Sequence, residues 1–192
     1  MSMGKELSSS GASRNKLAQT LLRTCLLKGK FQLRSGQVAS EYFDKYRFES
    51  DPNILQMVAD AMRPLVPTDA QVLAGLELGG VPLAIALSGA TGIPARFVRK
   101  TAKSYGTCEV VEGGNIAGKK LVIIEDVVTS GGQVLESAVE LRKSGAEILS
   151  VLCVVDREAG GAVSLAAAGL ELRSLFTFSE LRRLAEPQVP SR

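Results

Sequence analysis

The sequence predicts an α/β fold built around a central, mostly parallel sheet that is flanked by helices. From residue 71 onward, short apolar segments alternate with segments whose apolar residues recur at helical spacing. This alternation is typical of a parallel sheet with crossover helices. The apolar segments at 120–124 and 147–155 show no polar alternation, as expected for strands that are buried on both faces. In such sheets, ligands bind in the loops that follow the carboxyl ends of the strands.

Periodicity and turn residues place the individual elements. Leucines at helical spacing predict an amphipathic helix over 15–28. A hairpin over 31–48 that turns at residues 35–36 follows, and then a helix over 52–63 that begins at Pro52 behind the N-cap candidate Asp51. The remaining predicted elements are strands at 71–75, 95–98, 120–124, 147–155 and 170–176, and helices at 80–89, 132–144 and 160–168.

The composition excludes several classes of protein. The chain has 192 residues, of which 45% are hydrophobic, which is enough for one domain with a large core. It has no histidine and three widely spaced cysteines, so Cys/His zinc sites and Ser-His-Asp or Cys-His catalysis are excluded. A net charge of +3 does not indicate nucleic-acid binding, and no apolar stretch is long enough to span a membrane. We therefore expect a cytoplasmic protein with reduced thiols that binds neither nucleic acid nor membrane.

The most informative segment follows the predicted strand 120–124. Glu125 and Asp126 are adjacent carboxylates at the end of that strand, where desolvation is costly unless they have partners. Behind them, the segment TSGGQ at 129–133 leads into a helix and offers hydroxyls, glycines and a helix N-terminus to an anion. This layout suits a phosphorylated sugar, with its hydroxyls on the acids and its phosphate on the loop. An ordinary strand-to-helix turn with a solvated acid pair fits the periodicity equally well.

The thirteen residues LVIIEDVVTSGGQ at 121–133 resemble the phosphoribosyl pyrophosphate (PRPP) motif of the type I phosphoribosyltransferase family. The resemblance implies that Glu125 and Asp126 are catalytic and hold the ribose 2′- and 3′-hydroxyls. It also implies that the segment behind them holds the 5′-phosphate. The PRPP-binding residues of the motif would be Glu125, Asp126, Val127, Val128, Thr129, Ser130, Gly131, Gly132 and Gln133.

A basic loop precedes this motif in the chain. Arg99, Lys100 and Lys103 lie in a polar, glycine-rich stretch, for which a solvated surface is the ordinary interpretation. The segment VRKTAKSYGT within it, however, resembles the flexible catalytic loop of the orotate phosphoribosyltransferases in this family. That resemblance implies that the three cations and Tyr105 bind PRPP, that Lys103 is catalytic, and that the loop is shared between the subunits of a homodimer. Tyr105 replaces a histidine that many members carry.

Two further segments point to a site for the base. FQLRSGQVASEYFD at 31–44 resembles the N-terminal segment of the family, which implies that Arg34 and Phe43 bind orotate. Core packing is the alternative for the aromatic ring. The resemblance also implies that Arg157 pairs with the carboxylate of orotate, for which a planar guanidinium is suited, and that Thr129 adds a second contact. A surface salt bridge is the alternative for Arg157.

The segment LELGGVPLA at 76–84 resembles the pyrophosphate loop of the family. Many members carry a Tyr-Lys pair where this chain has Leu78 and Gly79. Backbone N–H groups or magnesium must therefore compensate for the missing side-chain cation.

The resemblance spans about residues 15–180 and implies the type I phosphoribosyltransferase fold. We expect a single domain at 15–185, with a small N-terminal hood at about 15–50 and the catalytic loop at about 99–114. Disordered tails are expected at 1–14 and 186–192.

The implied activity is the transfer of ribose 5-phosphate from PRPP to orotate, which gives orotidine 5′-monophosphate and pyrophosphate in pyrimidine (UMP) biosynthesis. The resemblance implies Mg²⁺ as the cofactor, carried by PRPP without direct protein ligands. A purine phosphoribosyltransferase of the same fold, a non-catalytic PRPP-sensing regulator and a degenerate family member are the alternatives.

Overall fold

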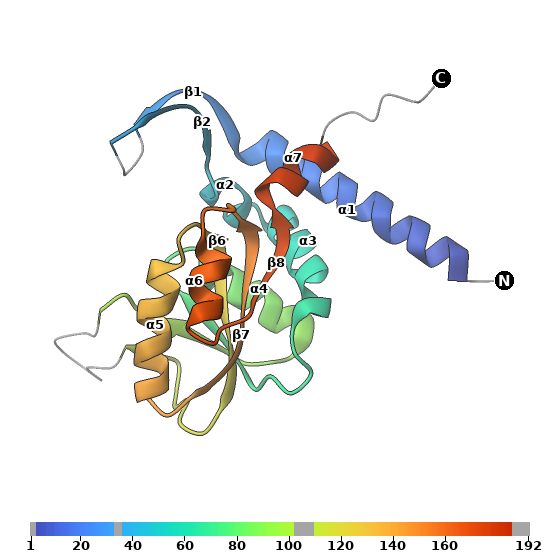
Figure 1. Cartoon of the computed structure of the whole chain (residues 1–192). Coiled ribbons are helices and arrows are strands. Elements are labelled where there is room, and N and C mark those ends of the chain that lie inside the picture. Colours follow the sequence, from blue (N-terminus) through green and yellow to red (C-terminus); the bar gives the residue numbers. More distant parts are fainter. Residues whose placement is uncertain (1–2, 33–35, 102–109, 186–192) are drawn as a thin grey trace, which may run out of the picture.

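A computed structural model describes residues 3–32, 36–101 and 110–185, with side chains from residue 13 onward. Its centre is a six-stranded sheet in the order β5-β4-β3-β6-β7-β8 (Figure 1). The strands are β3 (Val72–Leu76), β4 (Ala95–Val98), β5 (Val111–Glu112), β6 (Lys120–Val128), β7 (Glu147–Asp156) and β8 (Leu172–Thr177). All neighbouring pairs are parallel except β4 and β5, which confirms the predicted α/β class and its mostly parallel sheet.

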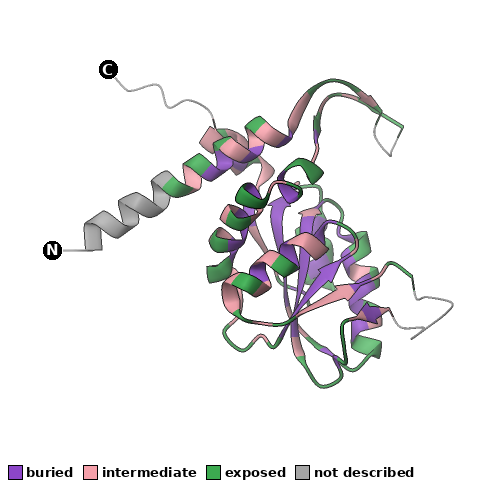
Figure 2. Ribbon diagram, turned by 180° about the vertical axis from the view of Figure 1, so that it is seen from behind, coloured by how far each residue is buried: buried purple, intermediate pink, exposed green. Residues whose placement is uncertain are grey.

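Helices cover both faces of the sheet. They are α3 (Pro52–Met62) and α4 (Gly80–Thr91) on one face, and α5 (Gly132–Lys143) and α6 (Gly161–Ala167) on the other. Along β6, Val122 and Ile124 pack into the core beneath the first pair, whereas Leu121 and Ile123 pack beneath the second. This alternation buries the strand on both sides, and the sheet forms the buried centre of the molecule (Figure 2).

The N-terminal hood packs against the core beneath α3 and α4, and only its hairpin projects from the sheet layers. It comprises the end of α1 (Met3–Cys25), the antiparallel strands β1 (Leu26–Gln32) and β2 (Val38–Phe43), and the short helix α2 (Tyr46–Glu49). In Figure 1 the β1–β2 hairpin projects from the body, while α1 lies beside the last helix, α7 (Phe178–Ala185). A 3₁₀ turn, Arg63–Leu65, follows α3.

Both ends of the chain differ from the sequence predictions. The helix α1 begins at Met3, so residues 3–14, which we expected to be a disordered tail, are helical. Arg14 anchors this helix, because its guanidinium bonds the Leu175 carbonyl at 2.6 Å and pairs with Glu180 at 3.0 Å. At the other end, α7 is an additional helix after β8, held by the buried Leu181. The predicted tail 186–192 lies outside the described residues.

The predicted first helix also ends early. Residues 26–28 were expected to be helical, but they pair with β2 and form the start of β1. The pairing sets Leu26 opposite Phe43, so the hairpin begins before the expected start at residue 31, and residues 46–48, which were expected to belong to it, lie in a helix. Its turn at 33–35 lies outside the described residues.

The strand order reverses between β3 and β6, which places the ligand crevice of the sheet at their carboxyl ends. There, β6 pairs with β3 only as far as Ile124, opposite Gly75. On its other side, β6 continues to pair with β7 as far as Val128, opposite Asp156. One edge of β6 is therefore free of strand partners from Glu125 onward.

No helix among the described residues is long and apolar enough to cross a membrane.

The cap of α3 offers a test of local stability. The Asp51 carboxylate accepts hydrogen bonds from the backbone N–H groups of Asn53 at 2.9 Å and Ile54 at 3.2 Å. We expect Asp51→Ala to lower the free energy of unfolding by about 1 kcal/mol, measured by urea titration. Asp51→Ser retains a capping oxygen and should lose clearly less; equal losses would show that the cap does not matter.

Candidate active site

The acid pair lies inside a strand and not after it. The prediction that Glu125 and Asp126 follow the end of the strand is wrong, because pairing with β7 extends β6 to Val128. Asp126 is fully buried and Glu125 is only 7% exposed. Since the β3 side of β6 is unpaired at this level, both carboxyls belong to the crevice where the strand order reverses.

A lysine from the hood meets this pair. The Lys45 ammonium lies 2.5 Å from Oδ2 of Asp126, while Oδ1 of Asp126 accepts a hydrogen bond from the backbone N–H of Val127. The backbone N–H of Asp126 donates to Oε1 of Glu125 at 3.1 Å. The buried Glu49, at the end of α2, also contacts the Asp126 carboxylate.

These contacts set the charges of the cluster. Burial, reinforced by the neighbouring Asp126 carboxylate, raises the pKa of Glu49 to about 8 and that of Glu125 well above its usual value. Burial would also raise the pKa of Asp126, but hydrogen bonds from Glu125 and Glu49 and the charge of Lys45 outweigh it and lower that pKa. Near neutral pH, Asp126 and Lys45 are therefore ionised, while Glu49 is largely protonated.

The predicted phosphate loop follows directly. Thr129 and Ser130 are exposed, and Gly131 has a φ of 80° at the N-cap of α5. That left-handed conformation favours glycine and turns the chain into the helix, so the loop and the helix N-terminus share one surface. Gly161 supports the loop from behind, since a Cβ there would lie 2.5 Å from the Thr129 carbonyl oxygen.

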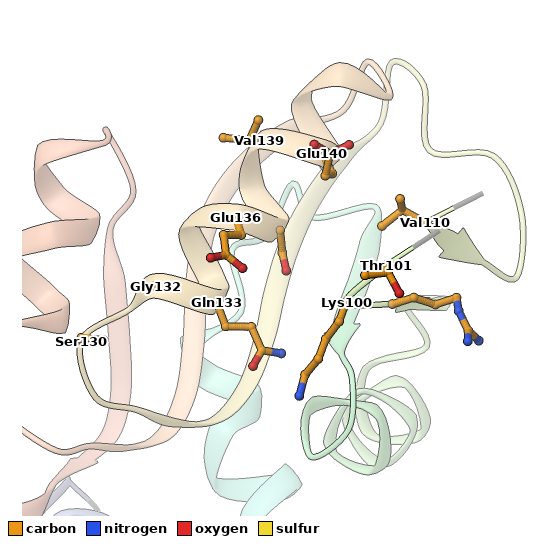
Figure 3. A pocket seen from close by; sticks show the side chains of 11 residues that line it. Lys100, Thr101, Val110, Ser130, Gly132, Gln133, Glu136, Val139 and Glu140 are labelled. Atoms are coloured by element: carbon orange, nitrogen blue, oxygen red, sulfur yellow. The ribbon is translucent and has the colours of Figure 1, made fainter. Parts of the chain in front are cut away.

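A cavity of about 910 Å³ extends from this loop along α5 (Figure 3). Ser130, Gly132 and Gln133 line it on the α5 side, and Arg99 and Lys100 line it from the end of β4. The structure thus brings two separate groups of predicted PRPP-binding residues to one cavity.

Glu77, in the loop after β3, joins the two sides of this cavity. The Gln133 side-chain amide donates to its carbonyl oxygen at 2.8 Å, and the backbone N–H of Lys100 donates to its carboxylate at 3.1 Å. The loop that resembles the pyrophosphate loop is therefore tied to both neighbours.

Two of the four predicted base-binding residues, Arg157 and Phe43, also meet, whereas Thr129 does not line their cavity. Arg157 and Phe43 line a second cavity of about 360 Å³, together with Phe178 and Arg182. The Arg157 guanidinium stacks 4.1 Å above the Phe178 ring, and Arg182 lies 4.8 Å from the same ring. Phe43 contacts Phe178 edge to face, with 6.1 Å between the ring centroids. Arg157 also donates its backbone N–H to the Val128 carbonyl at 2.8 Å, which fixes this cavity to the end of β6.

Glu158 fixes the turn that carries Arg157. It has a φ of 57°, which is unusual for a residue with a side chain. Its carboxylate accepts hydrogen bonds from the Ser179 N–H at 2.8 Å and the Ser179 hydroxyl at 2.7 Å. Its own N–H donates to Asp156 at 2.9 Å. Among the described contacts, Arg157 packs on an aromatic ring and not in the surface salt bridge that was its alternative.

Several site residues were not found from the sequence, and others cannot be placed. Lys45, Glu49, Glu77, Phe178 and Arg182 were missed. Lys45 follows the segment 31–44 directly, but a single hood lysine carries no pattern that points to a strand eighty residues later. The predicted residues Arg34, Lys103 and Tyr105 lie outside the described residues.

Comparison with known proteins identifies the family. The model of the phosphoribosyl transferase domain matches residues 47–169. An orotate phosphoribosyltransferase of a Nocardioides species is 50% identical over 86% of this chain and 92% of its own length. One from Methanocella arvoryzae is 41% identical over 86% of this chain and 95% of its own. This chain belongs to the orotate phosphoribosyltransferase family.

Solved structures place this phosphoribosyltransferase in the same fold. The Mycobacterium tuberculosis orotate phosphoribosyltransferase in complex with Fe(III) dicitrate matches with a TM-score of 0.80 and 33% identity, over 88% of this chain and 98% of its own. A structure of that protein in complex with PRPP matches with a TM-score of 0.76 and 30% identity, over 88% of this chain and 99% of its own. An adenine phosphoribosyltransferase shares the fold alone. It matches with a TM-score of 0.64 and 19% identity, over 83% of this chain and 99% of its own.

The buried acid Glu49 gives this phosphoribosyltransferase a distinctive pH dependence. Its pKa is about 8 when folded and near 4.5 when exposed, so the stability it contributes is present at low pH and is lost as the pH rises through 8. We expect the free energy of unfolding of Glu49→Gln to fall less between pH 5 and pH 9 than that of the wild type, measured by urea titration. Glu136→Gln, at an exposed position on α5, is the control. Parallel pH profiles for the wild type and Glu49→Gln would contradict the assignment.

Proposed function

We propose that this member of the family transfers ribose 5-phosphate from PRPP to N1 of orotate in the cytoplasm, giving orotidine 5′-monophosphate and pyrophosphate for UMP biosynthesis. One observation supports the proposal above the others. The acid pair, the phosphate loop and the Arg157 turn meet at the end of β6, where the strand order of the sheet reverses. The acid pair suits the ribose hydroxyls of PRPP, and the loop behind it suits the 5′-phosphate. The Arg157 guanidinium suits the carboxylate of orotate.

The ribose hydroxyls would bind Glu125 and Asp126, and the 5′-phosphate would bind residues 129–133. A hydroxyl that donates to Asp126 replaces part of the hydration that burial removes from this carboxylate. The phosphate would accept from the hydroxyls and backbone N–H groups at the start of α5, where the helix dipole favours an anion.

Orotate differs from the purine bases by its carboxylate, and Arg157 is suited to that group. Its guanidinium is partly buried, and burial followed by the nearby Arg182 lowers its pKa, although an arginine stays charged. Arg182 already pairs with Glu41, so a bound carboxylate would neutralise chiefly Arg157 in a partly desolvated cavity, where a charge-assisted bond is strong. Phe43 and Phe178 supply flat apolar surface for the pyrimidine ring.

Magnesium would enter with PRPP. The described residues contain no group of three or more acidic or sulfur side chains arranged to hold a metal ion. Mg²⁺ retains water and binds substrate phosphates with few protein ligands, so the acid pair would hold the hydroxyls next to the diphosphate and not the metal itself. When bound, Mg²⁺ would neutralise charge on the departing pyrophosphate.

The protein's side chains would promote the reaction by holding the substrates in place and by stabilising the charge that develops on the leaving group. The bond to pyrophosphate breaks as the sugar gains oxocarbenium character, and the acid pair holds that sugar in place. Orotate can bind with N1 already anionic, so no strong base is needed, which agrees with a chain that lacks histidine. Arg99, Lys100 and the catalytic-loop residues Lys103 and Tyr105 would stabilise the departing diphosphate. We propose that this loop is shared between the subunits of a homodimer.

An acceptor panel tests the activity. Purified protein, Mg²⁺ and PRPP are mixed with orotate, hypoxanthine, adenine or xanthine, and the loss of base and the release of pyrophosphate are measured. We expect turnover with orotate and with none of the three purines. Turnover with a purine would favour the purine enzyme, and PRPP binding without turnover would favour the regulator.

The role of Arg157 is tested in the same assay. Removing a charged hydrogen-bonding partner of the carboxylate should raise the KM for orotate roughly tenfold or more in Arg157→Ala, with a smaller effect on the KM for PRPP. Arg183→Ala, at an exposed position on α7, is the control. An unchanged KM for orotate in Arg157→Ala would exclude the carboxylate contact.

A further inference from the structure

Lys45 occupies an unexpected place in this site. It is the N-cap residue of α2 in the hood, two residues after Phe43, yet its ammonium reaches the buried Asp126 on the central strand at 2.5 Å. The Asp126 side chain is completely buried, whereas the Lys45 side chain remains 28% exposed. One ion pair therefore connects the hood segment that carries Phe43, a residue of the base cavity, to the acid pair on β6.

The loop after β3 leaves room for this contact. Gly79 lies so close that a Cβ there would be 1.6 Å from Oδ2 of Asp126 and 2.7 Å from Oε1 of Glu49. The absence of a side chain at this position lets α2 and β6 bring an ammonium and two carboxyls together beside the loop backbone. Lys45 thus supplies a cation where the loop itself carries none between Leu78 and Gly80.

The charges around Lys45 show what it does to Asp126. The titratable groups that face the pair are Asp44, Tyr46 and Glu49 from the hood, Glu125 on β6, and the buried thiol of Cys153 on β7. Among these groups the carboxyls oppose ionisation of Asp126 through their charge when they are deprotonated, and burial opposes it further. A hydrogen bond from Glu125, the charge of Lys45 and a hydrogen bond from Glu49 favour the ionised form, and Lys45 is the only cation among these three groups.

We propose that Lys45 is a positioning residue that keeps Asp126 ionised and oriented for the ribose hydroxyls of PRPP. This inference rests on the proposed function, because it assigns Asp126 to PRPP. A protonated Asp126 would have one acceptor oxygen fewer for a hydroxyl, so its state of charge decides how strongly the sugar is held. Lys45 acts through Asp126 and is not assigned a contact with the reacting atoms.

Lys45→Met tests the proposal. Without the ammonium, the pKa of Asp126 rises, so we expect PRPP affinity to fall roughly tenfold or more at pH 6 and less at pH 8, since the loss concerns a charged partner. The KM for PRPP should rise while kcat changes little, and the acid limb of the kcat/KM profile should move to higher pH. Lys45→Arg retains the charge and should restore most of the affinity at both pH values.

Titration calorimetry with PRPP alone, without orotate, separates this inference from the proposed activity. Lys30→Met, which removes an exposed lysine from the same hood, is the matched control and should bind PRPP as the wild type does. Should Lys45→Met not fold, Lys45→Gln takes the same measurements, because it keeps a hydrogen-bonding group without charge.

An unchanged PRPP affinity in a folded Lys45→Met or Lys45→Gln would overturn the role of Lys45. A loss of equal size at pH 6 and pH 8, or one that Lys45→Arg does not restore, would also overturn it. A wild type that binds PRPP but does not convert orotate would contradict the proposed activity and leave the calorimetric test of Lys45 intact.

Discussion

The architecture of this protein depends on the unequal pairing of its central strand. β6 loses β3 as a partner after Ile124 but keeps β7 as far as Val128. The segment between these two points is held rigidly by one neighbour while its other edge is open to side chains from elsewhere. A carboxyl placed there is fixed by the sheet and still reachable from the hood and the loop after β3, which is what a site for a small polar ligand needs.

This arrangement also explains why the base cavity lies where it does. Arg157 follows the last residue of β7 and bonds the backbone of Val128, so its position is set by the same strand pairing that fixes the acids. Phe178 and Ser179 at the start of α7 then hold the Arg157 guanidinium and the Glu158 turn. The helix at the C-terminal end of the described chain thereby shapes a cavity whose other wall comes from the N-terminal hairpin.

Local patterns in the sequence were sufficient for the parallel strands and for helices α3 to α6, but they missed the short elements β5 and α2. Segments such as 120–124 and 147–155 are apolar throughout, which predicts buried strands. Asp51-Pro52 predicts a helix start, because Asp can cap the first turn and Pro fits its first position. The extent of β6 was misjudged because Glu125 and Asp126 look like loop residues, and only long-range pairing with β7 makes them part of a strand. Lys45 and Glu49 were missed for the same reason, since their role exists only through contact with Asp126.

The close approach at Gly79 has a consequence for how this chain can diverge. Any larger residue at position 79 would have to occupy the volume that the carboxyl of Asp126 now fills. A side chain on that loop and the buried carboxyl of the central strand thus compete for the same space. A substitution at position 79 should therefore be tolerated only when the Asp126 carboxyl can move, a constraint that position 45 does not share.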